Sequence, residues 1–384
     1  MVCPTDSIRG CKRGNMRNPL PDSLYKSRIN ERDEDIRGPY FRDQTAIIHS
    51  LPFRRLKNKT QVFFAPENDH ICTRIEHVLH VSTISATICK GLGLDVELAQ
   101  AIALGHDLGH APFGHSGEDV LDRLNQNKGG FVHELHGLRI VDKLSRYGKG
   151  LNLTYAVRDG MVSHYGEEFS QSIEPREVKK NLSELRERGT PPTSYEGCVV
   201  RMSDKIAYFG RDIEDAIKAE LIEEEDIPEG VRAELGTKNG EIIDVFVKDL
   251  IGWSRENGRI GFSKDRYELM RDLKEFNYAN IYGHDRLKRY ARHAEVILNI
   301  LFDHLKGLMD EFGRNYKGYM ESDIPLDRRF GDYLRGLSDF YGVKEPFDQQ
   351  QIALDYIAGM TDQYALKAAK EVIFPEPIKF DHQN

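Results

Sequence analysis

Apolar residues recur at steps of three and four along most of the chain from about Tyr40 onward. This spacing places them on one face of an α-helix, whereas a half-buried strand would alternate apolar and polar residues. Residues 73–92 show the pattern most clearly, and glycines mark the expected end of that helix. Convincing strand signals are few, the best being short runs at 61–64 and 241–247. The sequence therefore predicts an all-α fold with a few short peripheral strands.

The 384 residues are enough for one large domain or two ordinary ones. Residues 1–40 are polar and lack an apolar period, so we expect a loosely ordered or interface-forming arm. Two charged stretches, near 166–195 and 222–240, are expected as surface inserts. They would belong to a helical core over 41–310, on which a C-terminal helical part over 311–384 packs.

Charge and composition exclude several classes of protein. The net charge of −8 argues against wholesale coating of nucleic acid, although a local basic pocket stays compatible with it. No run of about 18 apolar residues is present, so we expect no membrane-spanning helix. The N-terminus lacks the apolar region of a secretory signal, and the five cysteines form no C-x-x-C motif. These features predict a cytoplasmic protein with reduced thiols.

Ionisable residues stand inside otherwise apolar helical sequence. His106 and Asp107 are adjacent within the apolar segment 97–108, where we expect a helix, and His77 and Asp204 lie in two other predicted helices. An isolated buried charge costs several kcal/mol or more, so such groups are usually paired or bound to a metal. Two imidazoles and two carboxylates form a mixed N/O ligand set that suits a divalent metal. For any one of these residues alone, an ordinary core histidine or paired acid is the commoner explanation.

The sequence after this pair strengthens the metal interpretation. The stretch L-G-H-A-P-F-G-H-S-G-E adds His110, His115 and Glu118 within a few residues. Its glycines and proline suit a tight loop that curls back over a site, with a helix resuming at Glu118. This context, more than the His-Asp pair itself, favours a ligand role.

With these residues in place, the chain resembles the HD-domain superfamily and, more narrowly, the deoxynucleoside triphosphate triphosphohydrolases of the dGTPase family. The resemblance implies an HD-domain helical fold and covers most of the chain from about residue 40. Its most specific stretches are TRIEHVLHV, AIALGHDLGHAPFGHSGE, GGFVHE, MSDKIAYFGRDIEDAI and DYIAGMTDQYAL.

The resemblance implies a role for each matching residue. Four positions match the metal ligands of the family: His77, His106, Asp107 and Asp204. The catalytic positions match as a His–acid pair and a further histidine that reaches the phosphates: His115, Glu118 and His110. The other matches are to positions that bind the triphosphate, the 3′-hydroxyl or the sugar and base: Arg74, Lys205, His133, Tyr208, Asp212, Gln61 and Val62.

The spacing of part of this set agrees with the resemblance. Asp204, Tyr208 and Asp212 are four residues apart, so they share one face of one helix. An ordinary helix-surface pair stays the alternative for Tyr208 and Asp212. His164 could also approach the nucleotide, although a position on a helix surface is favoured. Asp362 could face the base, but the pattern assigns it no catalytic role.

The implied reaction converts a dNTP, dGTP among others, and water into a deoxynucleoside and intact triphosphate. The implied cofactor is a divalent ion at the His/Asp site (Mn, Mg, Fe, Co, Ni or Zn), with Mg²⁺ accompanying the triphosphate. The resemblance also implies a homo-oligomer, a hexamer or tetramer, with dNTP or single-stranded DNA as allosteric partner. The base preference, the physiological metal and the number of subunits are not contained in the sequence.

Two other functions compete with this one. A generic HD-domain phosphohydrolase, such as a nucleotidase or phosphodiesterase, would share the metal site and release orthophosphate or pyrophosphate instead. A non-enzymatic regulator that binds dNTP or single-stranded nucleic acid would use a basic groove with stacking aromatic residues, and FRRLKNKTQVFF has both ingredients.

Overall fold

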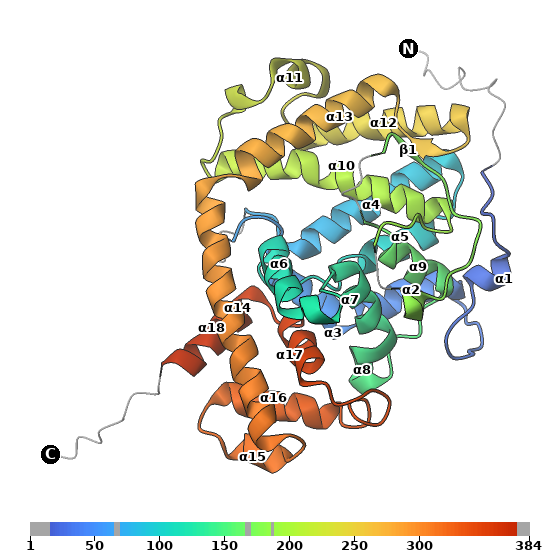
Figure 1. Ribbon diagram of the computed structural model, residues 1–384. Helices are drawn as coiled ribbons and strands as arrows, with labels where there is room; N and C mark the ends of the chain where they lie inside the picture. Colours follow the sequence, from blue (N-terminus) through green and yellow to red (C-terminus); the bar gives the residue numbers. More distant parts are fainter. Residues whose placement is uncertain (1–15, 65–69, 166–169, 186–187, 375–384) are drawn as a thin grey trace. The chain divides into compact units, whose positions relative to one another are not determined.

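The computed structural model describes residues 16–64, 70–165, 170–185 and 188–374. Helices dominate this part of the chain, and its only strands are β1 (Ser172–Ile173) and β2 (Ile260–Gly261), which pair antiparallel (Figure 1). The predicted all-α fold with short strands is therefore confirmed. Within the described residues no helix is long and apolar enough to cross a bilayer.

The chain divides into two compact units, each assembled from three separate segments. Unit 1 consists of Met1–Ile48, Glu76–Asp107 and Leu153–His284. Unit 2 consists of His49–Ile75, Leu108–Asn152 and Asp285–Asn384. The division into an arm over 1–40, a core over 41–310 and a part over 311–384 stays a prediction.

Unit 1 is built around the long helix α10, which packs against α5, α9, α12 and α13. Gly160 on α9 explains the close approach to α5, because a Cβ there would lie 2.5 Å from the Cδ1 atom of Ile102. The helices of this unit are α1 (Asp22–Tyr25), α2 (Gly38–Ile48), α4 (Arg74–Leu92, from Glu76 onward), α5 (Val96–Gly105), α9 (Tyr155–Val162), α10 (Tyr195–Lys218), α11 (Glu229–Leu235), α12 (Asn239–Asn257) and α13 (Lys264–Asn277). A π-helical turn, η6 (Tyr278–Tyr282), follows α13.

Unit 2 is organised by α14, whose buried leucines contact α6, α16, α17 and α18. Its amphipathic pattern, with Leu298, Leu301 and Leu305 buried at steps of three and four, is the reason these helices can cover one face of it. The helices are α3 (Leu51–Arg55), α6 (Gly114–Asn125), α7 (His133–Arg139), α8 (Ser145–Gly148), α14 (Asp285–Phe312), α15 (Tyr316–Glu321), α16 (Pro325–Gly336), α17 (Gln349–Ala358) and α18 (Asp362–Ile373). The short turns η1 (Leu56–Asn58), η2 (Gln126–Lys128) and η3 (Ile140–Leu144) extend α3, α6 and α7.

Several predicted element boundaries are wrong. Residues 241–247 lie inside α12 rather than in a strand, because Ile242, Phe246 and Leu250 form a buried helical stripe. At 61–64 no strand forms, and the extended chain there contributes only an isolated bridge between Thr60 and Thr73.

The surroundings of the His-Asp pair also differ from the prediction. Helix α5 ends at Gly105, so His106 and Asp107 lie in the turn after the helix rather than within it. Helix α6 begins at Gly114 and not at Glu118. Both differences arise in the glycine- and proline-rich stretch, whose turn geometry a periodicity argument does not resolve.

The predicted N-terminal arm is partly fixed in unit 1. The Tyr25 hydroxyl is buried and donates to the Thr193 carbonyl at 2.7 Å, and the Asn18 amide donates to Glu196 at 2.8 Å. This part of the arm is therefore packed and not loosely ordered, while residues 1–15 lie outside the described residues. The predicted inserts contain β1 in one case and α11 in the other, and their status as inserts stays a prediction.

The described cysteines agree with the expectation of reduced thiols. Cys72, Cys89 and Cys198 are buried and form no disulfide among the described residues, and burial raises the pKa of the Cys89 and Cys198 thiols well above the ordinary value. Cys3 and Cys11 lie outside the described residues.

Candidate functional site

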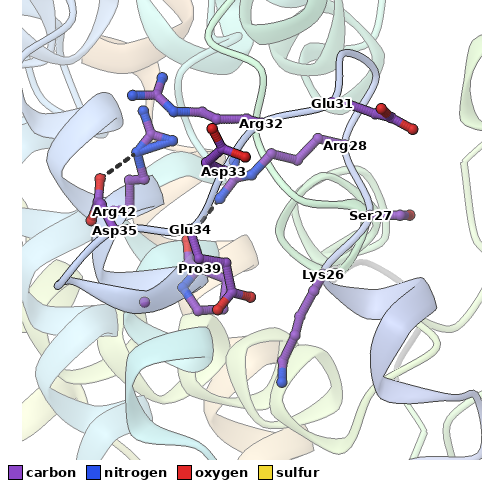
Figure 2. A pocket seen from close by; sticks show the side chains of 11 residues that line it. Lys26, Ser27, Arg28, Glu31, Arg32, Asp33, Glu34, Asp35, Pro39 and Arg42 are labelled. Carbon is purple, nitrogen blue, oxygen red and sulfur yellow. Dashed lines mark hydrogen bonds and ion pairs between the residues drawn. The ribbon is translucent and has the colours of Figure 1, made fainter.

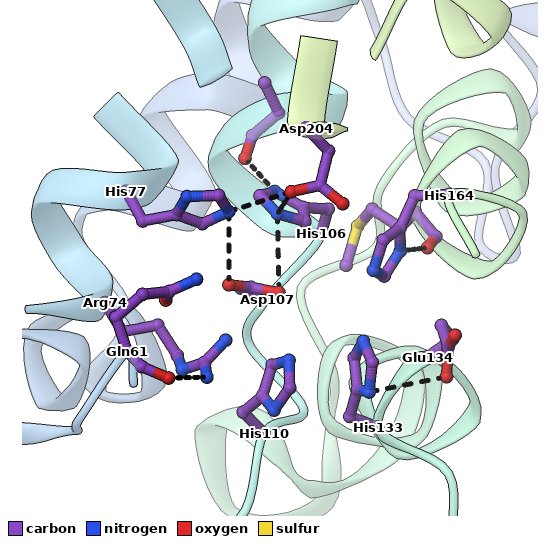
Figure 3. A network of polar contacts seen from close by, with 12 residues as sticks. Gln61, Arg74, His77, His106, Asp107, His110, His133, Glu134, His164 and Asp204 are labelled. Carbon is purple, nitrogen blue, oxygen red and sulfur yellow. Dashed lines mark hydrogen bonds and ion pairs between the residues drawn. The ribbon is translucent and has the colours of Figure 1, made fainter. Parts of the chain in front are cut away.

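A buried cluster in unit 1 contains the four residues predicted as metal ligands (Figure 3). His77 comes from α4, His106 and Asp107 from the turn after α5, and Asp204 from α10. The Nε2 atom of His77 lies 2.9 Å from Asp204 Oδ1 and 3.9 Å from Asp107 Oδ2. The Nε2 atom of His106 lies 3.3 Å from Asp107 Oδ1 and 3.8 Å from Asp204 Oδ1. Two helices and the turn after a third thus bring imidazole and carboxylate groups together.

His106 shows that this cluster suits a cation. Its Nδ1 atom lies 2.6 Å from the Ala103 carbonyl oxygen, which can only accept, so Nδ1 carries the proton and the lone pair is on Nε2. Burial lowers the pKa of His106 to about 4, so the ring is neutral at pH 7. Among the described residues nothing donates a hydrogen bond to this buried Nε2 atom, although carboxylates face it. A neutral imidazole lone pair beside carboxylates is a donor set that a divalent metal satisfies.

The Asp204 carboxylate of the cluster is held in its charged form. Burial alone would raise the pKa of Asp204, but its hydrogen bond with His77 and the neighbouring imidazoles outweigh this and hold the pKa at about 2. The ligand atoms of His77, His106 and Asp107 all lie within 4.8 Å of one another. His106 and Asp204 are therefore in the protonation states that binding of a metal ion requires at neutral pH.

Helix α10 also carries the unit 1 residues that are predicted to bind the sugar and the phosphates. It is continuous from Tyr195 to Lys218, so Asp204, Tyr208 and Asp212 share one face. The Lys205 and Asp212 side chains are buried, and the Tyr282 hydroxyl donates to Asp212 Oδ2 at 2.5 Å. Tyr282 was not foreseen, because it lies in the π-helical turn η6, 70 residues after Asp212.

His164 differs from the expected helix-surface position. It is buried, and its ring lies edge-on to that of His106 with 4.8 Å between the centroids. Its Nδ1 atom lies 2.5 Å from the Met161 carbonyl oxygen. The prediction failed because His164 follows the end of α9, where helical periodicity no longer indicates which side chains face the core.

Unit 2 contains a second group, made of His110, His115, Glu118 and His133. The buried Glu118 carboxylate accepts from the backbone N–H of His133 at 2.9 Å and lies 2.9 and 3.0 Å from its Nδ1 atom. The Nδ1 atom of His115 is 3.5 Å from Glu118, and 65% of the His115 side chain is exposed. The ring of His110 stacks on that of His133 with centroids 3.7 Å apart. Glu118 therefore lies closer to His133 than to His115, the histidine that was predicted to be its catalytic partner.

The charge state of Glu118 follows from these contacts. Burial would raise the pKa of its carboxyl, but the charge of His133 and hydrogen bonds with His115 and His133 lower it well below the ordinary value. In contrast with His106, the Nδ1 atom of His133 already has a carboxylate partner. This group is therefore suited to holding and moving a proton.

Two glycines explain why this group can assemble. A Cβ atom at Gly109 would lie 1.9 Å from the His133 carbonyl oxygen, and one at Gly117 would lie 1.8 Å from the Pro112 carbonyl oxygen. Between them, Phe113 takes a left-handed conformation (φ 67°) immediately before α6 begins. The stretch G-H-A-P-F-G-H-S-G thus folds back on the segment that carries His133, because no side chain stands in the way.

The loop with Gln61 and Val62, also in unit 2, is held by Arg74. The buried Arg74 guanidinium donates to the Thr60 carbonyl at 3.3 Å and to the Gln61 carbonyl at 3.4 Å (Figure 3). The side-chain oxygen of Gln61 is buried and has no hydrogen-bond partner among the described residues. It is thus an acceptor that a hydroxyl group could satisfy.

A pocket of about 470 Å³ in unit 1 contains none of the predicted site residues (Figure 2). It is lined by residues between Lys26 and Arg42, with basic and acidic side chains in equal number. Arg28 pairs with Asp43 at 2.6 Å, and Arg42 lies 3.1 Å from Asp35. It contains no histidine and none of the predicted ligands, so it is not a candidate for the chemistry of the two groups above.

Two protein-family models match segments of this chain. The HD domain model matches residues 74–208, and the phosphohydrolase-associated domain model matches residues 260–346. A hypothetical protein from Aquifex aeolicus aligns structurally with 79% of this chain and 68% of its own, at 19% identity and a TM-score of 0.38.

Three curated relatives carry the name deoxyguanosinetriphosphate triphosphohydrolase-like protein. The one from Caldanaerobacter subterraneus is 39% identical over 94% of this chain and 93% of its own. Those from Clostridium tetani and Desulfatibacillum aliphaticivorans are 38% and 35% identical, over 82% and 94% of this chain and 86% and 95% of their own. At this identity and coverage, the chain belongs to the HD-domain family of deoxyguanosinetriphosphate triphosphohydrolase-like proteins.

Proposed function

We propose that the chain is a metal-dependent dNTP triphosphohydrolase, which converts a dNTP and water into a deoxynucleoside and triphosphate. Membership of the family supports a phosphohydrolase, and the names of the relatives point to deoxyguanosine triphosphate as one substrate. The observation that carries the proposal is the neutral, buried His106, whose free Nε2 lone pair faces two carboxylates.

The metal would be held by His77, His106, Asp107 and Asp204. When bound, a divalent ion at such a site acts as a Lewis acid toward a phosphate oxygen. The remaining positive charge toward the triphosphate would come from Lys205 and Arg74, and ionic donors suit phosphate oxygens.

His115 is the proposed proton-transfer group, because its ring is exposed while Glu118 stays buried beside it. Water attacks the α-phosphorus, the bond to the 5′-oxygen breaks, and a proton from the water finally resides on that oxygen. Glu118 would hold the imidazoles of His115 and His133 in orientations that favour this transfer. His110, stacked on His133, would contribute to phosphate binding.

Sugar recognition is assigned to Tyr208, Asp212, Gln61 and Val62. Asp212 accepts a hydrogen bond from Tyr282, and its carboxylate is an acceptor of the kind that suits the 3′-hydroxyl. The unpartnered Gln61 oxygen is a further acceptor for a sugar hydroxyl. Homo-oligomer formation, activation by dNTP or single-stranded DNA, and a cytoplasmic location stay predictions.

The test is product analysis with purified protein. Each dNTP, alone and in mixtures, is incubated with Mn²⁺ or Mg²⁺ beside the matching NTP, and the products are separated by ion exchange. Triphosphate released from dNTPs alone supports the proposal, and release only in mixtures adds a nucleotide activator. Orthophosphate or pyrophosphate would instead indicate a generic HD-domain phosphohydrolase. No turnover with any metal would favour the dNTP- or nucleic acid-binding regulator.

A further inference from the structure

We propose that Asp362 and Lys59 are positioning residues for two segments of unit 2. One is the substrate-binding segment that begins with Gln61, and the other is the catalytic segment from His110 to Glu118. We call the two side chains the polar clamp. Neither is assigned to contact substrate, and both act through the backbone of other residues. The functional part of this inference rests on the proposed triphosphohydrolase activity.

Asp362 joins two segments that are about 50 residues apart in sequence. Its side chain lies at the first turn of α18 and is 2% exposed. One carboxylate oxygen accepts from the Thr60 N–H at 2.8 Å and from the Thr60 hydroxyl, while the other accepts from the Phe113 N–H at 2.9 Å. Thr60 directly precedes Gln61, and Phe113 is the left-handed residue before the helix of His115 and Glu118. The Asp362 carboxylate thus fixes the residue before Gln61 and the residue before the helix of His115 and Glu118.

Lys59 links the same two segments through hydrogen bonds of its own side chain and backbone. Its side chain is 3% exposed, and its ammonium group donates to the carbonyl oxygens of His110 and, at 2.7 Å, Ala358. The carbonyl oxygen of Lys59 accepts from the Arg74 N–H at 3.1 Å. Residues 59 and 60 are therefore hydrogen-bonded to the catalytic segment at His110, to Arg74, and to helices α17 and α18.

An aromatic group joins the same segments without directional bonds. Phe64 stacks on Tyr290 with 5.0 Å between ring centroids, and Phe113 lies 6.2 Å from Phe64 and 6.0 Å from Tyr290. Apolar packing of this kind can hold segments together but tolerates small shifts. Burying a carboxylate and an ammonium group is costly, and their charge-assisted hydrogen bonds define position and direction. The polar clamp is therefore best explained by a requirement for position in addition to stability.

Asp362→Asn is the most direct test, with Asp327→Asn as matched control. The asparagine keeps the volume, but its amide group would direct donors at the N–H groups of Thr60 or Phe113. Asp327 is an equally buried carboxylate of unit 2 on α16 that pairs with His304 at 2.7 Å and Ser322 at 2.6 Å, away from both segments. Backbone amide exchange of Thr60 and Phe113, the melting temperature, and kcat and KM for a dNTP are measured for both variants and for wild type.

We expect Asp362→Asn to speed exchange at Thr60 and Phe113 and to lower kcat/KM about 10- to 100-fold, since small misplacements of reacting groups have effects of this size. The control should lower the melting temperature comparably while leaving that exchange and KM close to wild type. Equal changes in both variants would mean that Asp362 only stabilises the fold, and would overturn the proposal.

Two further measurements separate the possible failures. If Asp362→Asn does not fold, Thr60→Val, which removes only one donor to the carboxylate, should still raise KM a few-fold, and an unchanged KM would overturn the proposal. If wild type releases no triphosphate, the proposed function fails on its own, and the polar clamp is then judged by exchange. Unchanged exchange at Thr60 and Phe113 would overturn it there as well.

Discussion

His106 of unit 1 and His133 of unit 2 are the same residue type in different electrostatic surroundings. In unit 1 the protonated side of His106 is occupied by the Ala103 carbonyl, and its lone pair faces carboxylates. In unit 2 the Nδ1 atom of His133 meets the Glu118 carboxylate directly. In the first arrangement a nitrogen lone pair faces carboxylate oxygens, and a bound cation would relieve their repulsion. In the second arrangement the ring nitrogen and the carboxylate already form a pair. The orientation of a ring, more than its residue type, therefore separates a metal-binding histidine from one that handles protons.

The largest effect should come from removing one of the proposed metal ligands of unit 1. His106→Ala deletes the imidazole that fits a metal best, so we expect both the bound metal and at least ~10³-fold of activity to be lost, more than a single oxyanion donor contributes. Metal content by elemental analysis and triphosphate release measure the two losses. A variant that keeps its metal and its activity would break the distinction between the two groups.

A smaller loss of a different kind is expected in unit 2. Glu118→Gln removes the charge that holds the imidazoles of His115 and His133, and should lower kcat about 10²- to 10³-fold, as for a disturbed general acid–base group. Its metal content should equal that of wild type. Loss of metal in Glu118→Gln would show that the unit 2 group also carries ligands.

His136 on α7 sharpens the comparison, because it is buried and neutral without belonging to either group. Burial lowers its pKa to about 4 from an ordinary value of 6.5. Between these pH values the unfolded chain binds a proton that the folded chain does not, so stability falls as the pH drops from about 6.5 toward 4. The loss attributable to this side chain is about 3 kcal/mol.

His136→Gln should therefore flatten this part of the pH–stability curve, measured by urea unfolding between pH 4 and 8. At pH 8 the wild-type ring is neutral in the folded and the unfolded state. The difference in free energy of unfolding between wild type and variant at this pH is therefore the reference. An equally steep curve in the variant would assign the acid sensitivity to other groups.

The sequence predicted the elements that follow a regular period and the residues placed on them. Apolar spacing located α4 almost to its ends and α10 less closely at both ends, and it placed His77 and Asp204 within these helices. It failed where glycine and proline set the backbone, as at the start of α6, and at 241–247, where a short apolar run fits strand and helix equally.

The contacts between distant residues were also beyond the sequence. Glu118 and His133 are 15 residues apart, and their pairing depends on how Gly109 lets the turn approach the His133 backbone. Tyr282 and Asp362 act through hydrogen bonds to residues 70 and about 250–300 positions away. Periodicity reports which face is buried, but it does not report which partner is met there.

Tyr282 provides the smallest test on the unit 1 side. Tyr282→Phe keeps the ring and removes the hydrogen bond to Asp212, and hydrogen bonds to charged acceptors contribute about 1.5–3 kcal/mol. If Asp212 grips the 3′-hydroxyl, the freed carboxylate should be less well oriented, and KM for dNTP should rise about 3- to 10-fold with metal content unchanged. Tyr278→Phe, on the same turn but half exposed, is the matched control and should leave KM close to wild type. Equal KM values in both variants would remove Tyr282 from the site and leave the orientation of Asp212 to α10 alone.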